Sequence, residues 1–294
     1  MALLTITSDS PGTGKTGVAT AIARHIAYTG RPVRLFRAIS GEPSTRSRAD
    51  AHWFSSLEFV PGSSNTPVQV DKIPDSAPDE LLVVESDAGI LSIPGADYVV
   101  FVNRGLPETL PETNPPAQII IATDIPAKEQ PESEINGIPL IALHEDRILN
   151  GFSIQEAQDL LRADRIVKGN RSERETCDHL VIAPISSDAG QPYLERFDSK
   201  AVVVRYDKTD QHLAALASNP ECLILTGGRQ PSDYLFDAAN ARGVPVLLSR
   251  TDTENTVIAL EGIFDNTQFQ GERKLERMAS LLEGSTLFET LDLN

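Results

Sequence analysis

Near its amino terminus the chain has a turn of small residues and glycines that ends in Gly14, Lys15 and Thr16. The backbone N–H groups of such a turn can point at a phosphate, and a helix N-terminus behind it adds positive potential. In this pattern Lys15 neutralises phosphate charge, and the Thr16 hydroxyl is placed to ligate Mg²⁺. The residues expected to contact a nucleotide are Ser10, Pro11, Gly12, Thr13, Gly14, Lys15, Thr16 and Gly17.

The segments on either side of this turn are those that a phosphate-binding loop requires. An apolar run over 3–7 predicts a strand, and apolar residues at helical spacing predict a helix over 16–29. Asp9 stands where the pattern G-x-x-x-x-G-K-[ST] has its first glycine. The order of strand, glycine turn and amphipathic helix still predicts a P-loop that binds nucleotide.

The first half of the chain alternates short apolar runs with helical or irregular stretches. Further strands are predicted over 33–37, 80–85, 98–103 and 119–122. Near-continuous apolar strands separated by helices are typical of a parallel sheet that is covered on both faces. The stretch 41–78 is rich in Ser, Pro, Gly and Asn, so we expect a loop there with one short helix over 48–57.

A second alternation of strands and helices follows residue 150. Ser153 and Glu156 form a capping-box pattern at the start of a helix predicted over 154–162. Further strands are predicted over 180–183, 201–205, 222–225 and 244–248, and helices over 211–217, 232–241, 254–264 and 271–282. The predicted fold is α/β, with a doubly wound, mostly parallel P-loop sheet followed by a smaller α/β domain. We expect domains at 1–148 and 152–285 and a loosely held tail over 286–294.

The second domain has its own glycine turn directly after a buried strand. Such a turn can form a backbone nest for an anion, or it can simply be a tight connection that needs no ligand. Asp252 or Thr253 is expected to cap the helix that follows the next strand. The residues proposed for a ligand of this domain are Thr226, Gly227, Gly228, Asp252 and Thr253.

Composition excludes several classes of protein. The chain has 294 residues, is 40% hydrophobic and 23% charged, and carries a formal net charge of −16. That charge argues against nucleic acid and anionic membrane as partners, because it repels phosphate. Cys177 and Cys222 make no disulfide framework or zinc motif. With no signal peptide and no apolar run of membrane-spanning length, a cytoplasmic protein is expected.

Residues beyond the loop resemble dethiobiotin synthetase and its relatives, which also replace the first glycine of the pattern. A basic residue, Arg37, ends the second strand, Asp50 and Ala51 begin a helix, and Glu85 ends a strand after Val84. The resemblance implies that ATP binds with Mg²⁺ held by Thr16, Asp50 and Glu85. It also implies that Lys15 and Arg37 take part in catalysis wherever chemistry occurs.

The second half resembles the DRTGG domain. The similar segments are the turn at 226–228, the strand at 243–247, Asp252 with Thr253, and the helix start at 272–274. The segment that gives the domain its name is altered, with 206–210 in its place. Together the two halves are similar to the N-terminal regulatory half of long bacterial phosphate acetyltransferases. This resemblance also implies self-association into a homo-oligomer.

Three functions remain open from the sequence. The first is an ATP- and Mg²⁺-binding regulatory or sensor protein whose second domain senses a small-molecule effector. The second is an ATP-dependent ligase that activates a carboxylate, or a weak ATPase. The third is a degenerate P-loop scaffold that binds no nucleotide. Because 294 residues leave no room for the transferase domain of the long enzymes, we expect no acetyl transfer by this chain itself.

Overall fold

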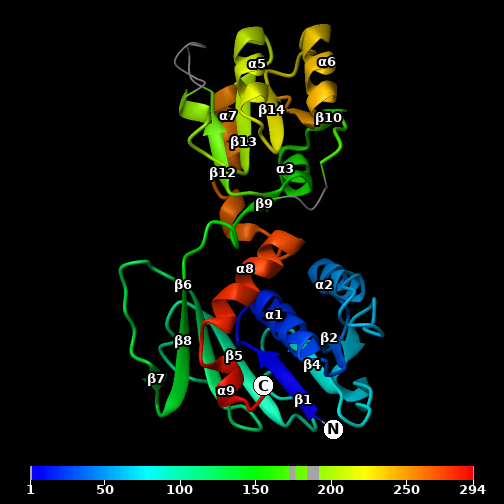
Figure 1. Cartoon of the computed structure of the whole chain (residues 1–294), viewed down its shortest axis with the longest axis vertical. Helices are drawn as coiled ribbons and strands as arrows, with labels where there is room; N and C mark the ends of the chain where they lie inside the picture. The colour runs from blue at the N-terminus through cyan, green and yellow to red at the C-terminus, as the bar shows by residue number, and fades with distance from the viewer. Residues whose placement is uncertain (1, 172–175, 184–191, 294) are drawn as a thin grey trace. The chain divides into compact units, whose positions relative to one another are not determined.

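The computed structural model divides into two compact units of α/β structure (Figure 1). It describes residues 2–171, 176–183 and 192–293. Unit 1 comprises Met1–Asp146 together with Lys274–Asn294, and unit 2 comprises Arg147–Arg273. Two mostly parallel sheets with helices confirm the predicted α/β class. The boundaries differ from the expected ones at the carboxyl end, because the chain from Lys274 onward belongs to unit 1.

Unit 1 begins with the predicted strand, glycine turn and helix. Its elements are β1 (Ala2–Thr7), α1 (Lys15–Tyr28), β2 (Val33–Ile39), α2 (Thr45–Ser55), β3 (Val68–Gln69), the 3₁₀ helix η1 (Val70–Lys72), β4 (Leu81–Ser86), β5 (Tyr98–Arg104), β6 (Ile119–Ile125), β7 (Glu134–Ile135), β8 (Ile138–His144), α9 (Leu287–Thr290) and, from Lys274 onward, α8 (Glu272–Glu283). Helix α2 starts three residues before the predicted helix, because the Ser44 hydroxyl accepts from the Ser47 N–H and caps it.

Among the described residues the sheet of unit 1 has eight strands in the order β3-β2-β4-β1-β5-β6-β8-β7. Every neighbouring pair is parallel except β7 with β8. The chain leaves β1 toward β2 and β4 on one side and later places β5 on the other, so the strand order switches at β1. Ligands of open α/β sheets bind at the carboxyl edge beside such a switch point. The glycine turn lies at that edge.

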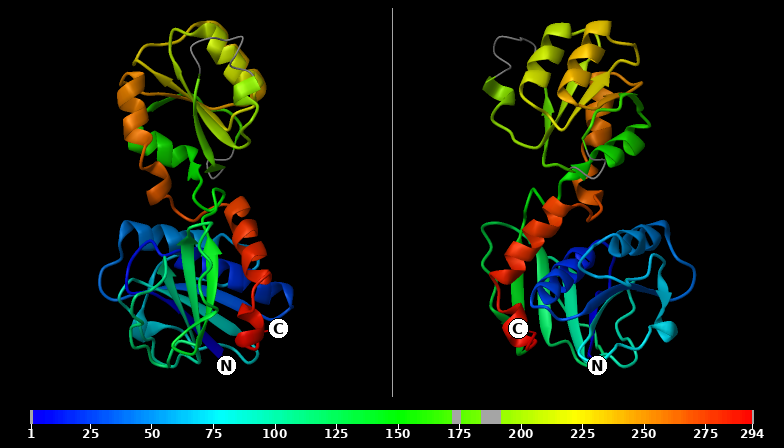
Figure 2. Two further views of the ribbon diagram at one scale, coloured as in Figure 1. Left: turned by 90° about the vertical axis from the view of Figure 1, so that its left-hand side faces the viewer. Right: turned by 45° about the vertical axis from the view of Figure 1, so that its right-hand side comes forward.

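One face of this sheet is covered by helices. Helices α8 and α9, orange to red in the figures, run beside α1 (Figures 1 and 2). The Phe288 ring of α9 stacks on His25 of α1 with ring centroids 3.6 Å apart. Leu287, Leu291 and Leu293 are also buried. The expectation of a loosely held tail over 286–294 was therefore wrong, because its apolar side chains complete this layer.

The opposite face is covered by irregular chain rather than by the expected helices. Buried residues of β5, β6 and β8 pack there against loop residues such as Leu91, Leu110 and Ala117. Proline accounts for the missing helices, because it cannot donate to an α-helix and clashes with the preceding turn. The segments after β5 and β6 contain Pro107, Pro111, Pro115, Pro116, Pro126 and Pro131.

Unit 2 has its own sheet, with order β10-β15-β14-β13-β12 among the described residues. The β12–β15 strands pair in parallel, and β10 is antiparallel to β15. Its elements are β9 (Phe152–Ser153), α3 (Ile154–Leu161), β10 (Asp164–Val167), β11 (Thr176–Cys177), β12 (His179–Ile182), β13 (Lys200–Arg205), α5 (Thr209–Ala217), β14 (Cys222–Thr226), α6 (Asp233–Arg242), β15 (Val246–Leu248), α7 (Thr253–Leu260) and η2 (Ile263–Asn266).

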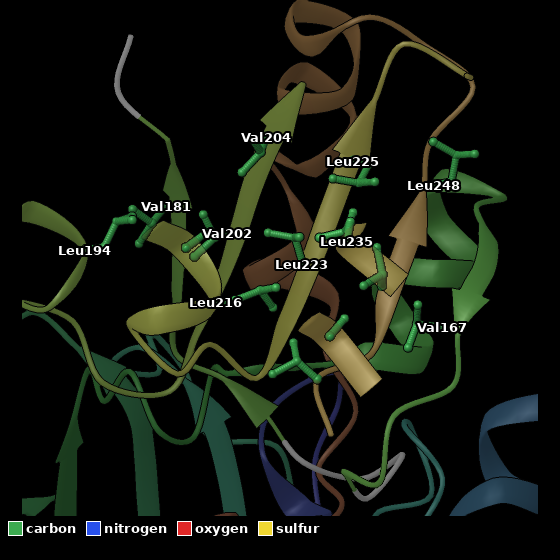
Figure 3. Packing of buried hydrophobic residues seen from close by; sticks show 14 residues of the cluster. Val167, Val181, Leu194, Val202, Val204, Leu216, Leu223, Leu225, Leu235 and Leu248 are labelled. Atoms are coloured by element: carbon green, nitrogen blue, oxygen red, sulfur yellow. The ribbon is translucent and has the colours of Figure 1, made fainter. Parts of the chain in front are cut away.

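Alternating residues of the central strands build a core on each face of this sheet. Val202 and Leu223 point toward Leu216 of α5 and Leu235 of α6 (Figure 3). The intervening residues, among them Ile224, pack on the other side with residues of α3 and α7. Unit 2 therefore has helices on both faces. No helix in the described part of the chain is both long enough and apolar enough to cross a membrane.

Candidate functional site

The glycine turn of unit 1 joins β1 to α1. Gly12 and Gly14 have φ values of +75° and +88°, in the left-handed region that favours glycine. A Cβ added to Gly14 would also lie 3.2 Å from Cγ2 of Thr123 on β6. Asp9 is not among the residues with positive φ. The position where the pattern has its first glycine therefore takes an ordinary side chain without backbone strain.

The backbone donors of this turn are available to a ligand. Within the described part of the chain, the N–H groups of residues 12–16 donate no hydrogen bond. Gly14, the N-cap residue of α1, receives no side-chain cap. Unpaired N–H groups at a helix N-terminus carry the positive end of the helix dipole. The turn thus presents several donors in succession, which is the arrangement that binds phosphate.

Lys15 is buried inside this turn. Its ammonium donates to the Ser8 hydroxyl and, at 3.4 Å, to the Ser10 carbonyl oxygen. Burial lowers the pKa of Lys15 to about 8, and the Arg37 charge adds to this effect, whereas Glu85 opposes it. A phosphate at the turn would favour the charged form and raise this pKa again. Lys15 is therefore placed as the predicted phosphate cation.

The remaining predicted site residues lie together behind the turn. Thr16 donates to Oε1 of Glu85 at 2.9 Å. Arg37 of β2 is in register with Glu85 of β4, and the guanidinium forms an ion pair with that carboxylate. The Arg37 Nη1 atom lies 3.9 Å from Oδ2 of Asp50, and Nη2 donates to Oδ1 of Asp87 at 2.6 Å. We name Arg37, Asp50, Glu85 and Asp87 the acidic cluster.

The three carboxylates of the acidic cluster carry more negative charge than the single Arg37 guanidinium offsets. Asp50 and Glu85 are both nearly fully buried, and Asp50 Oδ2 and Glu85 Oε2 accept no hydrogen bond from the described residues. Burial raises the pKa of Asp50 to about 7, and the Glu85 charge acts in the same direction, against Arg37 and Arg46. Carboxylates removed from water favour their protonated form unless a cation compensates them.

The oxygens expected to bind Mg²⁺ are thus the ones that face Arg37. Hydroxyl and carboxylate oxygens are suitable magnesium ligands by type. However, the Arg37 guanidinium already faces both carboxylates and supplies a cation to them without a metal. The donor set in this arrangement does not fit a resident metal. The assignment of Mg²⁺ to Thr16, Asp50 and Glu85 stays a prediction.

Several residues at this site were not identified from the sequence. Asp87 follows Glu85 by two positions at the end of β4, and this strand-end placement was its only signal. Ser8 is the partner of Lys15. Thr123 donates to the Thr13 carbonyl oxygen at 3.0 Å, although 110 residues separate them. Only the strand order, which no local pattern encodes, brings β6 close to the turn.

The glycine turn of unit 2 is built differently. Gly227 and Gly228 have φ values of +98° and +65°, and their N–H groups donate to the carbonyl oxygens of Thr251 and Ser249 at 2.7 and 3.0 Å. A Cβ on Gly227 would lie 2.7 Å from the Tyr206 ring. These contacts match the tight-connection alternative, and the anion nest lacks free donors at the two glycines.

The other ligand candidates of unit 2 also have partners within the unit. The hydroxyl oxygens of Thr226 and Thr253 lie 2.7 Å apart. Asp252 caps α7, because its carboxylate accepts from the Asn255 N–H at 2.8 Å. Sequence reasoning missed the hydroxyls of Ser249, Thr251 and Thr256, which contact one another at 2.8–3.0 Å beside this turn. A ligand role for the five candidates stays a prediction.

Comparison with known proteins identifies the second half of the chain. The family described as DRTGG domain matches residues 156–263, so the chain contains a DRTGG domain, which lies within unit 2. A similar solved structure comprises the CBS and DRTGG domains of the regulatory region of Clostridium perfringens pyrophosphatase, complexed with the activator diadenosine tetraphosphate. It is 17% identical with a TM-score of 0.35, and the match covers 42% of this chain and 53% of that chain. The chain thus spans about half the length of that neighbour, and a TM-score this low supports no conclusion about shared structure or ligand.

Proposed function

We propose that unit 1 binds ATP through the glycine turn, and that the chain is a nucleotide-responsive regulatory protein with a DRTGG domain. The observation that carries this proposal is the run of unpaired N–H groups over residues 12–16 beside the buried Lys15 ammonium. Free donors and a cation at one helix N-terminus fit the phosphate chain of a nucleotide. The base that is recognised is inferred from the resemblance to dethiobiotin synthetase alone.

The surroundings of Arg37 favour regulation over ligase chemistry. A ligase of the dethiobiotin synthetase type would use this basic residue on a phosphate or on the carboxylate being activated. Here its guanidinium faces Glu85, Asp50 and Asp87, and its charge is committed to them. The proposal has three further parts that rest only on the resemblance in sequence to the regulatory half of phosphate acetyltransferases. They are a relationship to those regulatory halves, a small-molecule effector of unit 2, and self-association of the chain.

Calorimetric titration of the full chain with ATP tests the proposal. We expect saturable binding by the unaltered protein and loss of at least about 100-fold in affinity in Lys15→Ala, because the phosphates lose their buried cation. Lys128→Ala is the matched control, because Lys128 is an exposed lysine of the same unit. Absence of heat with ATP, ADP and GTP would leave only the scaffold hypothesis.

Phosphate release measured on the same samples separates the two ATP-binding hypotheses. The regulatory protein binds ATP without sustained release of phosphate, and small carboxylic acids do not change this. Release that rises when such acids are added, and that disappears in Lys15→Ala, would favour the ligase instead.

A further inference from the structure

The acidic cluster of unit 1 contains a cation that belongs to the protein itself. Arg37 is 7% exposed, and its guanidinium meets Glu85 through Nη1 and Asp87 through Nη2. The same Nη1 lies 3.9 Å from Oδ2 of Asp50. One side chain thus spans three carboxylates, two of which are the buried acids of the phosphate site.

We infer that Arg37 is the resident cation of the phosphate site and takes the place of Mg²⁺, so that nucleotide binds to this protein with little requirement for the metal. This inference rests on the proposed ATP site and adds a statement about which cation serves it. The negative charge of Asp50 and Glu85, the carboxylates at the proposed nucleotide site, is then compensated by Arg37 from a neighbouring strand instead of by a metal ion.

Geometry explains why arginine can do this. The guanidinium is a planar fork with five N–H donors, so it can contact several carboxylates at once, whereas an ammonium is a point charge. Arg37 and Glu85 are paired positions on adjacent parallel strands, so the backbone itself holds the guanidinium at Glu85. Asp87, two residues further along, fixes the other end of the fork at 2.6 Å.

A divalent cation would have to displace this arrangement. Arg37 and Thr16 both contact Oε1 of Glu85, so a divalent cation at that oxygen would displace the guanidinium or the hydroxyl. Oε2 of Glu85 has no hydrogen-bond partner among the described residues, but it belongs to the carboxylate that Arg37 already pairs with. An arginine released from Glu85 and Asp50 would retain only Asp87 of the three carboxylates in the acidic cluster. A divalent cation and the Arg37 guanidinium are both positively charged, so they would repel each other if both lay beside Glu85 and Asp50.

The phosphate-contacting groups do not depend on a metal in this arrangement. The N–H groups of residues 12–16 and the Lys15 ammonium are supplied by the turn itself. Arg37 lies close enough to Lys15 that its charge contributes to lowering the Lys15 pKa, so both cations act on the same space. Arg37 offsets part of the negative charge of Asp50 and Glu85, which would otherwise repel phosphate more strongly.

Calorimetric titration of the full chain with ATP, in EDTA and in excess MgCl₂, tests the inference. We expect the affinity of the unaltered protein to differ by less than about threefold between the two buffers. Arg37→Gln is expected to bind at least about tenfold more tightly with Mg²⁺ than in EDTA, because its uncompensated carboxylates then need the metal. Arg34→Gln is the matched control, because Arg34 is an ion-paired arginine of the same strand whose partner is Glu80.

A second readout uses Mg²⁺ without nucleotide. Excess MgCl₂ should raise the melting temperature of Arg37→Gln and leave that of the unaltered protein and Arg34→Gln unchanged. Should Arg37→Gln fail to fold, the double variant Arg37→Gln/Glu85→Gln removes one charge of each sign and is expected to bind ATP equally in both buffers.

The outcomes separate the inference from the proposed function. Binding by the unaltered protein that is at least about tenfold tighter with Mg²⁺ overturns the inference and leaves the ATP site in place. No binding in either buffer overturns the ATP site and the inference together. Equal affinity in both buffers for the unaltered protein, with metal dependence appearing in Arg37→Gln, supports both.

Discussion

The two glycine turns of this protein look alike in sequence and differ in what their backbone donors do. Each follows a buried strand of a mostly parallel sheet and contains two glycines with positive φ. In unit 1 the N–H groups of residues 12–16 have no acceptor among the described residues, and Lys15 lies buried beside them. In unit 2 the N–H groups of Gly227 and Gly228 already donate to carbonyl oxygens.

The difference shows that a strand followed by glycines is not by itself a binding site. Hydrogen-bond donors that are satisfied within the turn hold the fold together, and donors that are left open must find water or a ligand. The same contrast holds for charge. Behind the turn of unit 1 lie Arg37, Asp50, Glu85 and Asp87, the first three of them buried. Beside the turn of unit 2 the buried polar groups include hydroxyls that contact one another.

The largest expected effect tests whether the acidic cluster strains the folded state. Burial raises the pKa of Asp50 in the folded protein from its ordinary value of 3.8 to about 7, so the folded protein keeps a proton that the unfolded chain releases between these pH values. Stability contributed by this group therefore falls as pH rises from about 4 to about 7, by at most about 4 kcal/mol. Asp50→Asn, which stays neutral, should lack this loss.

Urea unfolding at pH 5 and pH 8, followed by the fluorescence of Trp53, measures this effect. Trp53 is the only tryptophan and is buried in α2, the helix that carries Asp50. Asp50→Asn should gain stability relative to the unaltered protein on going from pH 5 to pH 8. If the free energies of unfolding of the two proteins differ by the same amount at pH 5 and pH 8, Asp50 does not have the raised pKa, and the positive charges around it compensate its carboxylate fully.

The next effect tests whether the turn of unit 2 is structural. Gly227→Ala places a Cβ 2.7 Å from the Tyr206 ring at a φ of +98°, so it should lower the free energy of unfolding by about 2–3 kcal/mol. ATP affinity should not change. Gly262→Ala is the control, because a Cβ there meets no atom within 4 Å. Thermal unfolding measures the stability of both variants, and calorimetry measures their ATP affinity. Weaker ATP binding in Gly227→Ala alone would contradict a purely structural role for the turn of unit 2.

A smaller effect concerns the protonation of Lys15. Its pKa of about 8 lies below its ordinary value, so the free protein loses this cation above pH 8, whereas bound phosphate requires it charged. ATP affinity should therefore fall by about eightfold between pH 7.5 and pH 9. Titrations across this range provide the measurement. An affinity that is constant to pH 9 would mean that Lys15 does not contact the phosphates.

The smallest effect concerns the hydroxyl contacts beside the turn of unit 2. Thr253→Val removes the 2.7 Å contact with the Thr226 hydroxyl and should cost about 1 kcal/mol of stability. Thr290→Val serves as the control, because the Thr290 hydroxyl is exposed and bonds only within its own helix. ATP titrations of the two variants should coincide, and a selective loss in Thr253→Val would assign a ligand role to this cluster.

Local patterns predicted the parts of the fold that depend on neighbours in sequence. Strand β1, the glycine turn and helix α1 follow from apolar spacing and from Gly12 and Gly14 within a single stretch. The capping box of Ser153 and Glu156 is present as expected. By contrast, α2 begins earlier than predicted because the cap is Ser44, which lies outside the apolar pattern.

Features that depend on distant contacts were not accessible in the same way. That Arg37 meets Glu85 follows from the pairing of β2 with β4, and no local pattern sets this register. We expected helices on both faces of the sheet and did not weigh the prolines after β5 and β6, which explain the irregular chain on one face. Likewise the spacing of Leu287, Phe288 and Leu291 fits one helical face, yet only the packing against α1 shows why these side chains are buried.

Hydrogen–deuterium exchange of the full chain with and without saturating ATP tests the contrast between the two turns most directly. Peptides that cover 9–17 and 223–231 report on the two sets of backbone donors in one experiment. We predict slower exchange over 9–17 in the presence of ATP and unchanged exchange over 223–231. Unchanged exchange over 9–17, or protection over 223–231 in its place, would contradict the assignment of the open turn as the nucleotide site.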